Sequence, residues 1–329
     1  MNRFASVGCA IMCALALRGA DMRVGIIGLD TSHAIEFTKA LNATNRAPEF
    51  AGFRVVAAYP KGSADIVAST NRVPGYIEKV KPLGVEIVGS IDELLAKSDV
   101  VLLESNDGRP HLEQALPVFK SGKRVFIDKP VAGTLAQCVA LYDAAAKYHT
   151  PMFSASSLRY TVKMREICGG KFGPVLGAET YGPCSLEATH PDFFWYGIHA
   201  VEMLFAAMGP ECESVVRVST PGTDVAVGTW KDGRVGSFRG TRSSKYAFGG
   251  DVFFAKSVER VDDYKGYELL LGEIVTFFKT GVVPVRPEET IAIFAFMEAA
   301  DESRRRGGVP VKIADVLAKA RAEAAQMSY

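Results

Sequence analysis

The sequence lacks an excess of charge of either sign. Its 329 residues include 38 Lys and Arg against 37 Asp and Glu, a formal net charge of +1, and no basic block stands out. This balance argues against broad electrostatic attraction to nucleic acid or to an anionic membrane, so we expect a small molecule as the partner. Internal repeats and low-complexity segments are also missing. With 48% hydrophobic residues, the chain can bury a large core, and two domains are expected.

Cysteine is scarce and widely spaced. The six cysteines include no C-x-x-C pair, so the spacing predicts neither a zinc site nor a redox pair, and we assign no metal. A chain of this size does not need disulfides to fold. We therefore expect buried, free thiols at Cys138, Cys168, Cys184 and Cys212.

No apolar run is long enough to span a bilayer comfortably. The run from Phe4 to Leu17 follows Arg3 and contains the small-residue segment Ala14-Leu15-Ala16. This pattern predicts a signal peptide over residues 1–21 and export to the periplasm. The alternative is that Met22 is the true first residue, which would leave the protein in the cytoplasm.

Short β-branched runs alternate with longer amphipathic stretches over residues 22–150. Such alternation predicts an α/β fold, here a Rossmann domain with a doubly wound parallel sheet. Residues 63–80 are weakly patterned, and we expect mostly loop there. Consecutive strands flanked by helices over residues 151–329 predict an α+β domain with an open, mostly antiparallel sheet. The expected strands are 24–28, 53–58, 86–88, 100–104, 124–127 and 152–155 in the first domain and 175–181, 214–219, 224–231 and 234–241 in the second.

The first expected strand ends at Gly28, where a Rossmann domain places its glycine-rich phosphate turn. A G-x-G-x-x-G pattern read from Gly28 has Asp30 at the second glycine and His33 at the third. A carboxylate at the second position would oppose a bound phosphate. The chain therefore has the pattern of a nucleotide-binding fold but departs from it at the turn that usually binds the cofactor.

Four segments together resemble the Gfo/Idh/MocA oxidoreductases, the superfamily of glucose–fructose oxidoreductase and the inositol dehydrogenases. They are Val-Gly-Ile-Ile-Gly at 24–28, the segment 104–111 with Asn106 and His111, Gly-Lys-Arg-Val-Phe-Ile-Asp-Lys-Pro at 122–130, and Gly-Ile-His at 197–199. The resemblance implies NAD or NADP on the first domain and a sugar, cyclitol or related polyol against the sheet of the second. It also implies a homo-oligomer assembled through the open face of that sheet.

The resemblance places Lys129 at the family's E-K-P lysine and His199 at its catalytic histidine. A lysine ammonium can stabilise an alkoxide, and an imidazole can take a proton from a hydroxyl. The family's acid four residues before the histidine is absent, because Trp195 occupies that position and would meet His199 on one helix face. Tyr196 or Asp192 could substitute for the acid. The resemblance implies that the substrate meets Arg159, Tyr160, Trp195 and His199, and that Lys129, His199 and Tyr196 are catalytic.

The cofactor residues follow from the same resemblance. In one interpretation Gly28 turns the chain, Thr31 and Ser32 donate to phosphate, and Asp30 points aside. In another, Asp30 and His33 belong to a protein that has lost or rearranged dinucleotide binding, and Asp30, His33 and His199 are possible metal ligands. Tyr59 stands where an acid would hold the ribose, and Lys61 and Ser63 could accept a 2′-phosphate. The expected cofactor contacts are Gly25, Gly28, Asp30, Thr31, Ser32, His33, Tyr59, Asn106, His111, Asp128 and Lys129.

The sequence leaves three functions open. The first is an NAD(P)-dependent oxidoreductase acting on a hydroxyl of a sugar, cyclitol or related polyol. The second is a redox-neutral enzyme that cleaves glycosides with a retained cofactor, which export would favour because free NAD(P) is scarce outside the cytoplasm. The third is a sugar-binding or regulatory protein without catalysis, built on a degenerate dehydrogenase scaffold.

Overall fold

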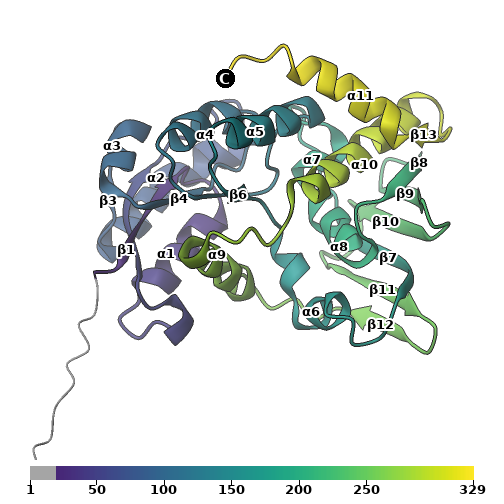
Figure 1. Ribbon diagram of the computed structural model, residues 1–329, viewed down its shortest axis with the longest axis horizontal. Coiled ribbons are helices and arrows are strands. Elements are labelled where there is room, and N and C mark those ends of the chain that lie inside the picture. Colours follow the sequence, from purple (N-terminus) through teal and green to yellow (C-terminus); the bar gives the residue numbers. More distant parts are fainter. Residues whose placement is uncertain (1–19) are drawn as a thin grey trace, which may run out of the picture.

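The computed structural model describes residues 20–329 (Figure 1). The predicted signal peptide, residues 1–21, falls almost wholly outside this range. Among residues 20–329, no helix is both long enough and apolar enough to cross a membrane. The chain forms two sheets, each covered by helices, and the cavity described below lies where the two halves meet.

The first sheet has six parallel strands in the order β3-β2-β1-β4-β5-β6, which confirms the predicted doubly wound Rossmann sheet. The Val-, Ile- and Leu-rich runs of β1, β4 and β5 are buried, as strands covered by helices on both faces require. The strands are β1 (Met22–Ile27), β2 (Phe53–Tyr59), β3 (Glu86–Ile87), β4 (Val100–Leu103), β5 (Val125–Ile127) and β6 (Met152–Phe153). The helices are α1 (Ser32–Asn42), α2 (Val67–Val80), α3 (Ile91–Lys97), α4 (His111–Lys120) and α5 (Leu135–Lys147).

The prediction of mostly loop over residues 63–80 is wrong, because residues 67–80 form the helix α2. The sequence gives little sign of this helix for two reasons. Pro74 lies inside it, where proline is disfavoured, and the helix buries only Ser69 and Val80.

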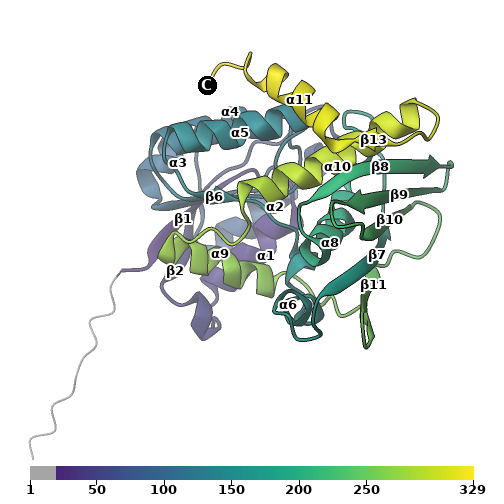
Figure 2. The same cartoon turned by 45° about the vertical axis from the view of Figure 1, so that its right-hand side comes forward.

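The second sheet has seven strands in the order β12-β11-β7-β10-β9-β8-β13, and its only parallel pair among the described residues is β7 with β10. This confirms the predicted mostly antiparallel sheet. Helices cover one face of it, and the other face carries none (Figure 2). The strands are β7 (Val175–Pro183), β8 (Cys212–Ser219), β9 (Thr223–Trp230), β10 (Val235–Thr241), β11 (Gly249–Phe254), β12 (Val258–Val261) and β13 (Val311–Lys312). The helices are α6 (Val162–Cys168), α7 (Asp192–Trp195), α8 (Ile198–Met208), α9 (Glu268–Thr280), α10 (Pro287–Arg305) and α11 (Ile313–Ala324).

The C-terminal half also returns to the first domain. Helix α9 lies beside α1 (Figure 1). Its residues Leu270, Ile274 and Phe277 are buried in one apolar cluster with residues of β1 and α1. Helices α10 and α11 pack on α5. A division at residue 150 therefore leaves strand β6 of the first sheet, and helices that pack on the first domain, in the second part of the chain.

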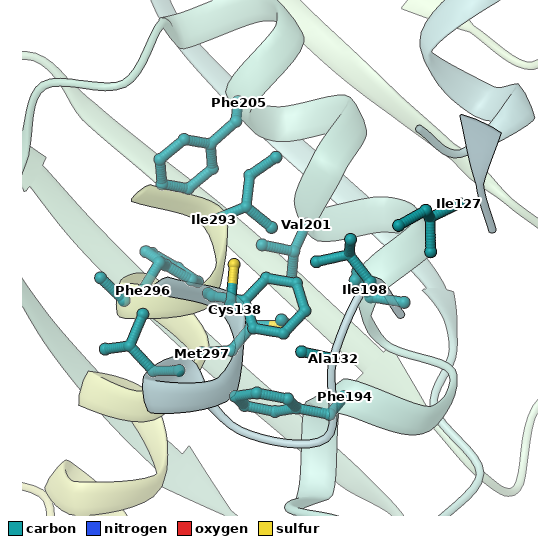
Figure 3. Close-up of a cluster of buried hydrophobic side chains, with 14 of the residues drawn as sticks. Ile127, Ala132, Cys138, Phe194, Ile198, Val201, Phe205, Ile293, Phe296 and Met297 are labelled. Atoms are coloured by element: carbon teal, nitrogen blue, oxygen red, sulfur yellow. The ribbon is translucent and has the colours of Figure 1, made fainter. Parts of the chain in front are cut away.

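A buried apolar cluster joins the two halves (Figure 3). Ile127 and Cys138 of the first domain meet Phe194 and Val201 of α7 and α8, and Phe296 of α10. Because close-packed cores do not deform continuously, this cluster fixes the relative position of the two walls of the cavity.

The expectation of free thiols holds for all four described cysteines. Cys138, Cys184 and Cys212 are buried as predicted, whereas Cys168 is exposed at the end of α6.

Candidate active site

A cavity of about 610 Å³ lies between the carboxyl ends of the first sheet and the helical side of the second. Residues of α1 and α2 line one side of it, and Lys129, Trp195, Tyr196 and His199 line the other. In doubly wound sheets, ligands bind outside the carboxyl ends of the strands at the point where the strand order reverses. Here that point lies between β1 and β4.

The turn after β1 requires a glycine at position 28. Gly28 has φ +88°, and a Cβ there would lie 2.5 Å from the backbone nitrogen of Ser105. Gly25 has a different role, because a Cβ there would lie 2.9 Å from Leu94 Cγ and Ser98 Oγ. Gly25 thus permits α3 to pack on the sheet, and only Gly28 shapes the turn.

We expect Gly28→Ala to lower the free energy of unfolding by about 3 kcal/mol or more, because the new methyl group meets backbone and the residue is held at positive φ. Gly52→Ala is the matched control, since Gly52 has φ +85° with nothing within 4 Å of its Cβ position. That control should lose only about 1–2 kcal/mol. Urea unfolding measures both, and equal losses would show that contact with Ser105 carries no penalty.

Asp30 does not face the phosphate position. Its carboxylate is buried and accepts hydrogen bonds from the Asn106 backbone N–H at 3.0 Å and from the Ser69 hydroxyl at 2.7 Å. Burial raises the pKa of Asp30 to about 6, although both hydrogen bonds oppose this. This placement agrees with the interpretation in which Asp30 points aside and the turn stays open to an anion.

The first turn of α1 can bind an anion. Thr31 caps the helix by accepting from the Ala34 backbone N–H at 3.3 Å, and the cavity reaches Thr31, Ser32 and His33. Backbone N–H groups at a helix start attract phosphate. Arg72 of α2 also lines the cavity here, and its guanidinium donates to the Asp30 carbonyl oxygen at 3.1 Å.

Three buried ionisable groups meet below this turn. His33 Nδ1 lies 2.9 Å from Asp128 Oδ1, and the Thr31 hydroxyl donates to Glu104 Oε2 at 3.4 Å. Burial, followed by the charge of Asp128, raises the pKa of Glu104 well above its usual range. Burial also acts to raise the pKa of Asp128, but the charge and hydrogen bond of His33 outweigh it, so that this pKa is lowered. The sequence interpretation did not single out Glu104.

Lys129 and His199, the two residues that the motifs singled out, line the same cavity. Lys129 follows Asp128, precedes a cis proline bond, and places Nζ 5.9 Å from the centre of the Tyr196 ring. The Ser156 hydroxyl lies 2.8 Å from His199 Nδ1, which leaves Nε2 for the cavity. Burial lowers the pKa of His199 well below its usual value, and the nearby charges of Lys129 and His33 add to this. The neutral imidazole is therefore the stable form.

The expected contact between Trp195 and His199 does not form. Helix α7 ends at Trp195 and α8 begins at Ile198, so the spacing of four residues does not run along one helix. The His199 ring packs instead on Tyr196 at 5.2 Å, and Trp195 packs on His190 at 5.0 Å. Both Trp195 and Tyr196 still line the cavity.

Aromatic residues complete the cavity wall, and apart from Tyr196 no motif in the sequence indicated those described here. Tyr196 shares a hydroxyl–hydroxyl hydrogen bond with Tyr246, and burial raises the pKa of Tyr196, so it stays protonated. Phe248, Tyr264 and Tyr267 come from the loops around β11 and β12. Tyr267 also contacts the first domain, where its hydroxyl lies 3.0 Å from Ser32 Oγ.

Arg159 and Tyr160 do not line the cavity, contrary to the expectation that they contact substrate. Arg159 forms ion pairs with Glu202 at 2.8 Å and with Glu289 at 2.6 Å, which hold it inside the second domain. Glu202 also accepts from the Ser156 backbone N–H at 2.8 Å. Arg159 is therefore a positioning residue, because the chain of contacts runs through Glu202 and Ser156 to His199.

Two further expected cofactor contacts, His111 and Tyr59, lie outside the cavity, as do Gly25, Gly28 and Asp30. His111 is fully buried, with ring nitrogens 3.2 Å from the Val131 carbonyl and 2.9 Å from the Ser105 carbonyl, so it ties the segments after β4 and β5 together. Tyr59, at the end of β2, lies outside the cavity. Asn106 does line the cavity, and both polar atoms of its side chain are buried without a partner among residues 20–329.

A hydrogen bond and an ion pair join the loop after β2 to the segment after β4. The Ser63 hydroxyl donates to Asp107 at 2.5 Å, and Arg109 pairs with Asp65 at 2.9 Å. His190 Nε2 lies 3.1 Å from the same Asp107. Since β2 and β4 flank β1, these contacts cross the carboxyl end of β1. Ser63 is committed to Asp107, so it is not free to bind a 2′-phosphate as the sequence suggested.

The residues that line the cavity fit part of a nicotinamide dinucleotide. The start of α1 and Arg72 fit its phosphates, and the unpartnered Asn106 amide fits the nicotinamide side. The contacts of Asp107 with Ser63 and of Arg109 with Asp65 join the loop after β2 to the segment after β4 beside this region.

Comparison with known proteins identifies a relative of the first domain. Residues 22–155 match the sequence model of the Gfo/Idh/MocA family, described as an oxidoreductase family with an NAD-binding Rossmann fold. The first domain of the chain therefore matches the Gfo/Idh/MocA oxidoreductase family. This match confirms the predicted NAD-binding Rossmann domain and the resemblance to an oxidoreductase family over residues 22–155. No curated protein sequence matches the chain.

Solved structures of Gfo/Idh/MocA type share the whole fold. Apo scyllo-inositol dehydrogenase from Lactobacillus casei superposes with TM-score 0.72 at 17% identity, covering 90% of this chain and 99% of that one. The same enzyme with NAD(H) and scyllo-inositol gives 0.70 at 18% identity, with 89% and 99% covered. An oxidoreductase from Agrobacterium radiobacter, in complex with NAD+, L-tartaric acid and magnesium, gives 0.70 at 13% identity, with 91% and 100% covered. At these identities the likeness establishes the fold alone.

Proposed function

We propose that this protein is an NAD(P)-dependent oxidoreductase that acts on a hydroxyl group of a sugar, cyclitol or related polyol. The observation that carries the proposal is that Lys129 and His199, from different domains, face one cavity beside the start of α1. The structural neighbour that binds scyllo-inositol supports this substrate class.

The chain's own residues supply the proton chemistry in this proposal. His199 is neutral, and its Nε2 takes the proton from the substrate hydroxyl while Ser156 holds Nδ1. Lys129 donates to the same oxygen and stabilises the negative charge that develops there. A bound nicotinamide ring supplies the hydride acceptor. Trp195 and Tyr264 offer aromatic surfaces for the apolar C–H faces of a polyol.

The test is an assay of sugars, cyclitols and other polyols with NAD and with NADP, followed by the absorbance of reduced nicotinamide. We expect turnover with at least one polyol and a clear preference for one dinucleotide. Absence of nucleotide from purified protein, combined with no binding of added NAD or NADP, would contradict the proposal.

A redox-neutral enzyme that cleaves glycosides with a retained cofactor is the second candidate. It requires that the contacts of Asp107 with Ser63 and of Arg109 with Asp65, which join the loop after β2 to the segment after β4, close over a bound cofactor and slow its exchange. Export through residues 1–21, which we also propose, would favour a retained cofactor. Mass analysis of nucleotide released on denaturation, together with glycoside cleavage that produces no net NAD(P)H, distinguishes this candidate from the first.

We further propose a homo-oligomer assembled through the open face of the second sheet. That face exposes Val227 at 37% and Val235 at 51%, beside Tyr181 and Arg239. Apolar side chains on an uncovered sheet mark an interaction surface.

We expect Val227→Glu to weaken this assembly by roughly 2 kcal/mol, about thirtyfold in the dissociation constant, because it would bury an unpaired charge. Light scattering after gel filtration measures the mass. The control is Val67→Glu on α2, where the valine is 73% exposed and lies far along the chain from this sheet. A monomeric wild-type protein, or an unchanged mass for Val227→Glu, would contradict the proposed interface.

A further inference from the structure

Three buried side chains converge at the carboxyl edge of the first sheet. His33 lies in the first turn of α1, Glu104 directly after β4 and Asp128 directly after β5. Because β1, β4 and β5 are neighbours in the sheet, their carboxyl ends bring these residues to one place. Each residue offers a ligand atom, and these atoms all lie within 4.8 Å of one another.

The two carboxylates have unsatisfied oxygens. Both side chains are fully buried, and Glu104 Oε1 and Asp128 Oδ2 have no hydrogen-bond partner among residues 20–329. A buried carboxylate without a partner is costly, and two beside each other repel. His33 contacts only the Oδ1 atom of Asp128, and the Thr31 hydroxyl donates only to the Oε2 atom of Glu104. The two remaining carboxylate oxygens can therefore accept a further positively charged partner.

One imidazole and two carboxylates are the donor set of a divalent transition ion such as Zn²⁺ or Mn²⁺. Metal–ligand bonds of about 2.0–2.2 Å separate the ligand atoms of one ion by roughly 3–4 Å. The separation of 2.9 Å between His33 Nδ1 and Asp128 Oδ1 is already near that range, and the other ligand atoms are within an ångström of it.

We propose that His33, Glu104 and Asp128 bind a divalent transition-metal ion whose remaining coordination position opens into the cavity. His33 and Asp128 both line that cavity, next to Lys129. The open position would hold a water or a substrate oxygen, as in zinc sites with three protein ligands. This site goes beyond the oxidoreductase activity proposed above and does not depend on it.

The sequence had suggested a different set of possible ligands. The Asp30 carboxylate accepts a hydrogen bond from Ser69, and His199 Nδ1 lies at the Ser156 hydroxyl. Neither Asp30 nor His199 therefore belongs to the trio, the cluster of His33, Glu104 and Asp128. Glu104 and Asp128 take their places beside His33. The sequence-based assignment of no metal rested on the spacing of residues along the chain. Such spacing does not reveal a cluster whose members come from three separate parts of the chain.

The experiment uses the full-length protein, stripped with a chelator and titrated with Mn²⁺ while the electron paramagnetic resonance signal of free Mn²⁺ is followed. Zn²⁺ is then added as a competitor. We expect one ion per chain and displacement by Zn²⁺. Glu104→Gln keeps the shape of the side chain but removes a ligand charge, and should weaken Mn²⁺ binding at least tenfold. Asp262→Asn is the control, because Asp262 lines the same cavity outside the trio and its loss should leave binding unchanged.

Two results would overturn the inference. One is a wild-type protein that binds neither ion at millimolar concentration. The other is a folded Glu104→Gln variant that binds Mn²⁺ as tightly as the wild type. Circular dichroism checks the fold of each variant. His33→Gln provides a second variant with the same expected loss if Glu104→Gln does not fold. No step of the titration requires a nucleotide, so failure here leaves the oxidoreductase proposal untouched.

Discussion

Replacing Lys129 with methionine should lower kcat by about 10²–10³-fold and leave the fold intact. The ammonium faces the cavity from the end of β5 and is the group placed to stabilise negative charge on a substrate oxygen. Removal of one such electrostatic contact typically costs this much in rate. Methionine keeps the length and the apolar stem of the side chain, so packing against Tyr196 is retained.

Lys245→Met is the control for this substitution, because Lys245 lines the same cavity from the loop before β11. We expect it to change KM at most modestly, since it carries no assigned proton or charge role. Turnover by Lys129→Met at the wild-type rate, with either cofactor and the best substrate, would remove Lys129 from the mechanism. Thermal unfolding of both variants checks that the comparison is between folded proteins.

The sequence could predict the fold because its evidence is local and strong. Buried strands such as Val100–Leu103 have apolar runs that few other structures accommodate, and Gly28 lies at a turn that needs positive φ. The prediction was weakest where a segment buries little of itself. Helix α2 shows this, because it buries only Ser69 and Val80 and contains Pro74, which argues against a helix.

The candidate site was only partly predictable. Lys129 and His199 were predicted from motifs, and both face the cavity. Arg159 was expected at the substrate because of its place after β6, but two carboxylates hold it elsewhere. The direction of a long side chain depends on partners distant in the chain, such as Glu289, and a motif does not contain them. Glu104 was missed for the same reason, since its importance appears only beside His33.

The aromatic wall illustrates a second limit of sequence reasoning. Tyr264 and Tyr267 come from a connection between β12 and α9 that has no recognisable motif. They enter the site because α9 returns to pack on the first domain and carries Tyr267 against His33, with ring centres 4.3 Å apart. Such a return is a property of tertiary packing, and it also shows why residue 150 is an incomplete domain boundary.

His199→Asn should lower kcat by about 10²–10⁴-fold, the usual contribution of a positioned general base. The asparagine amide keeps a polar group beside Ser156 and supplies no base to the cavity. The pH dependence gives a second readout. Burial, with the charges of Lys129 and His33, lowers the pKa of His199 well below 6.5, so the acid limb of the wild-type rate profile should lie well below pH 6.5. The variant should lose that limb.

The same pKa shift has a consequence for stability, and its sign is fixed. In the unfolded chain, His199 takes up a proton as the pH falls through about 6.5, whereas in the folded protein it stays neutral until much lower pH. The unfolded state therefore binds more protons in that window, and the wild type should lose stability as the pH falls below about 6.5. His199→Asn should lose less over the same window, as measured by urea unfolding at several pH values. If His199→Asn kept the acid limb and the stability profile of the wild type, His199 would neither titrate in this range nor act as the base.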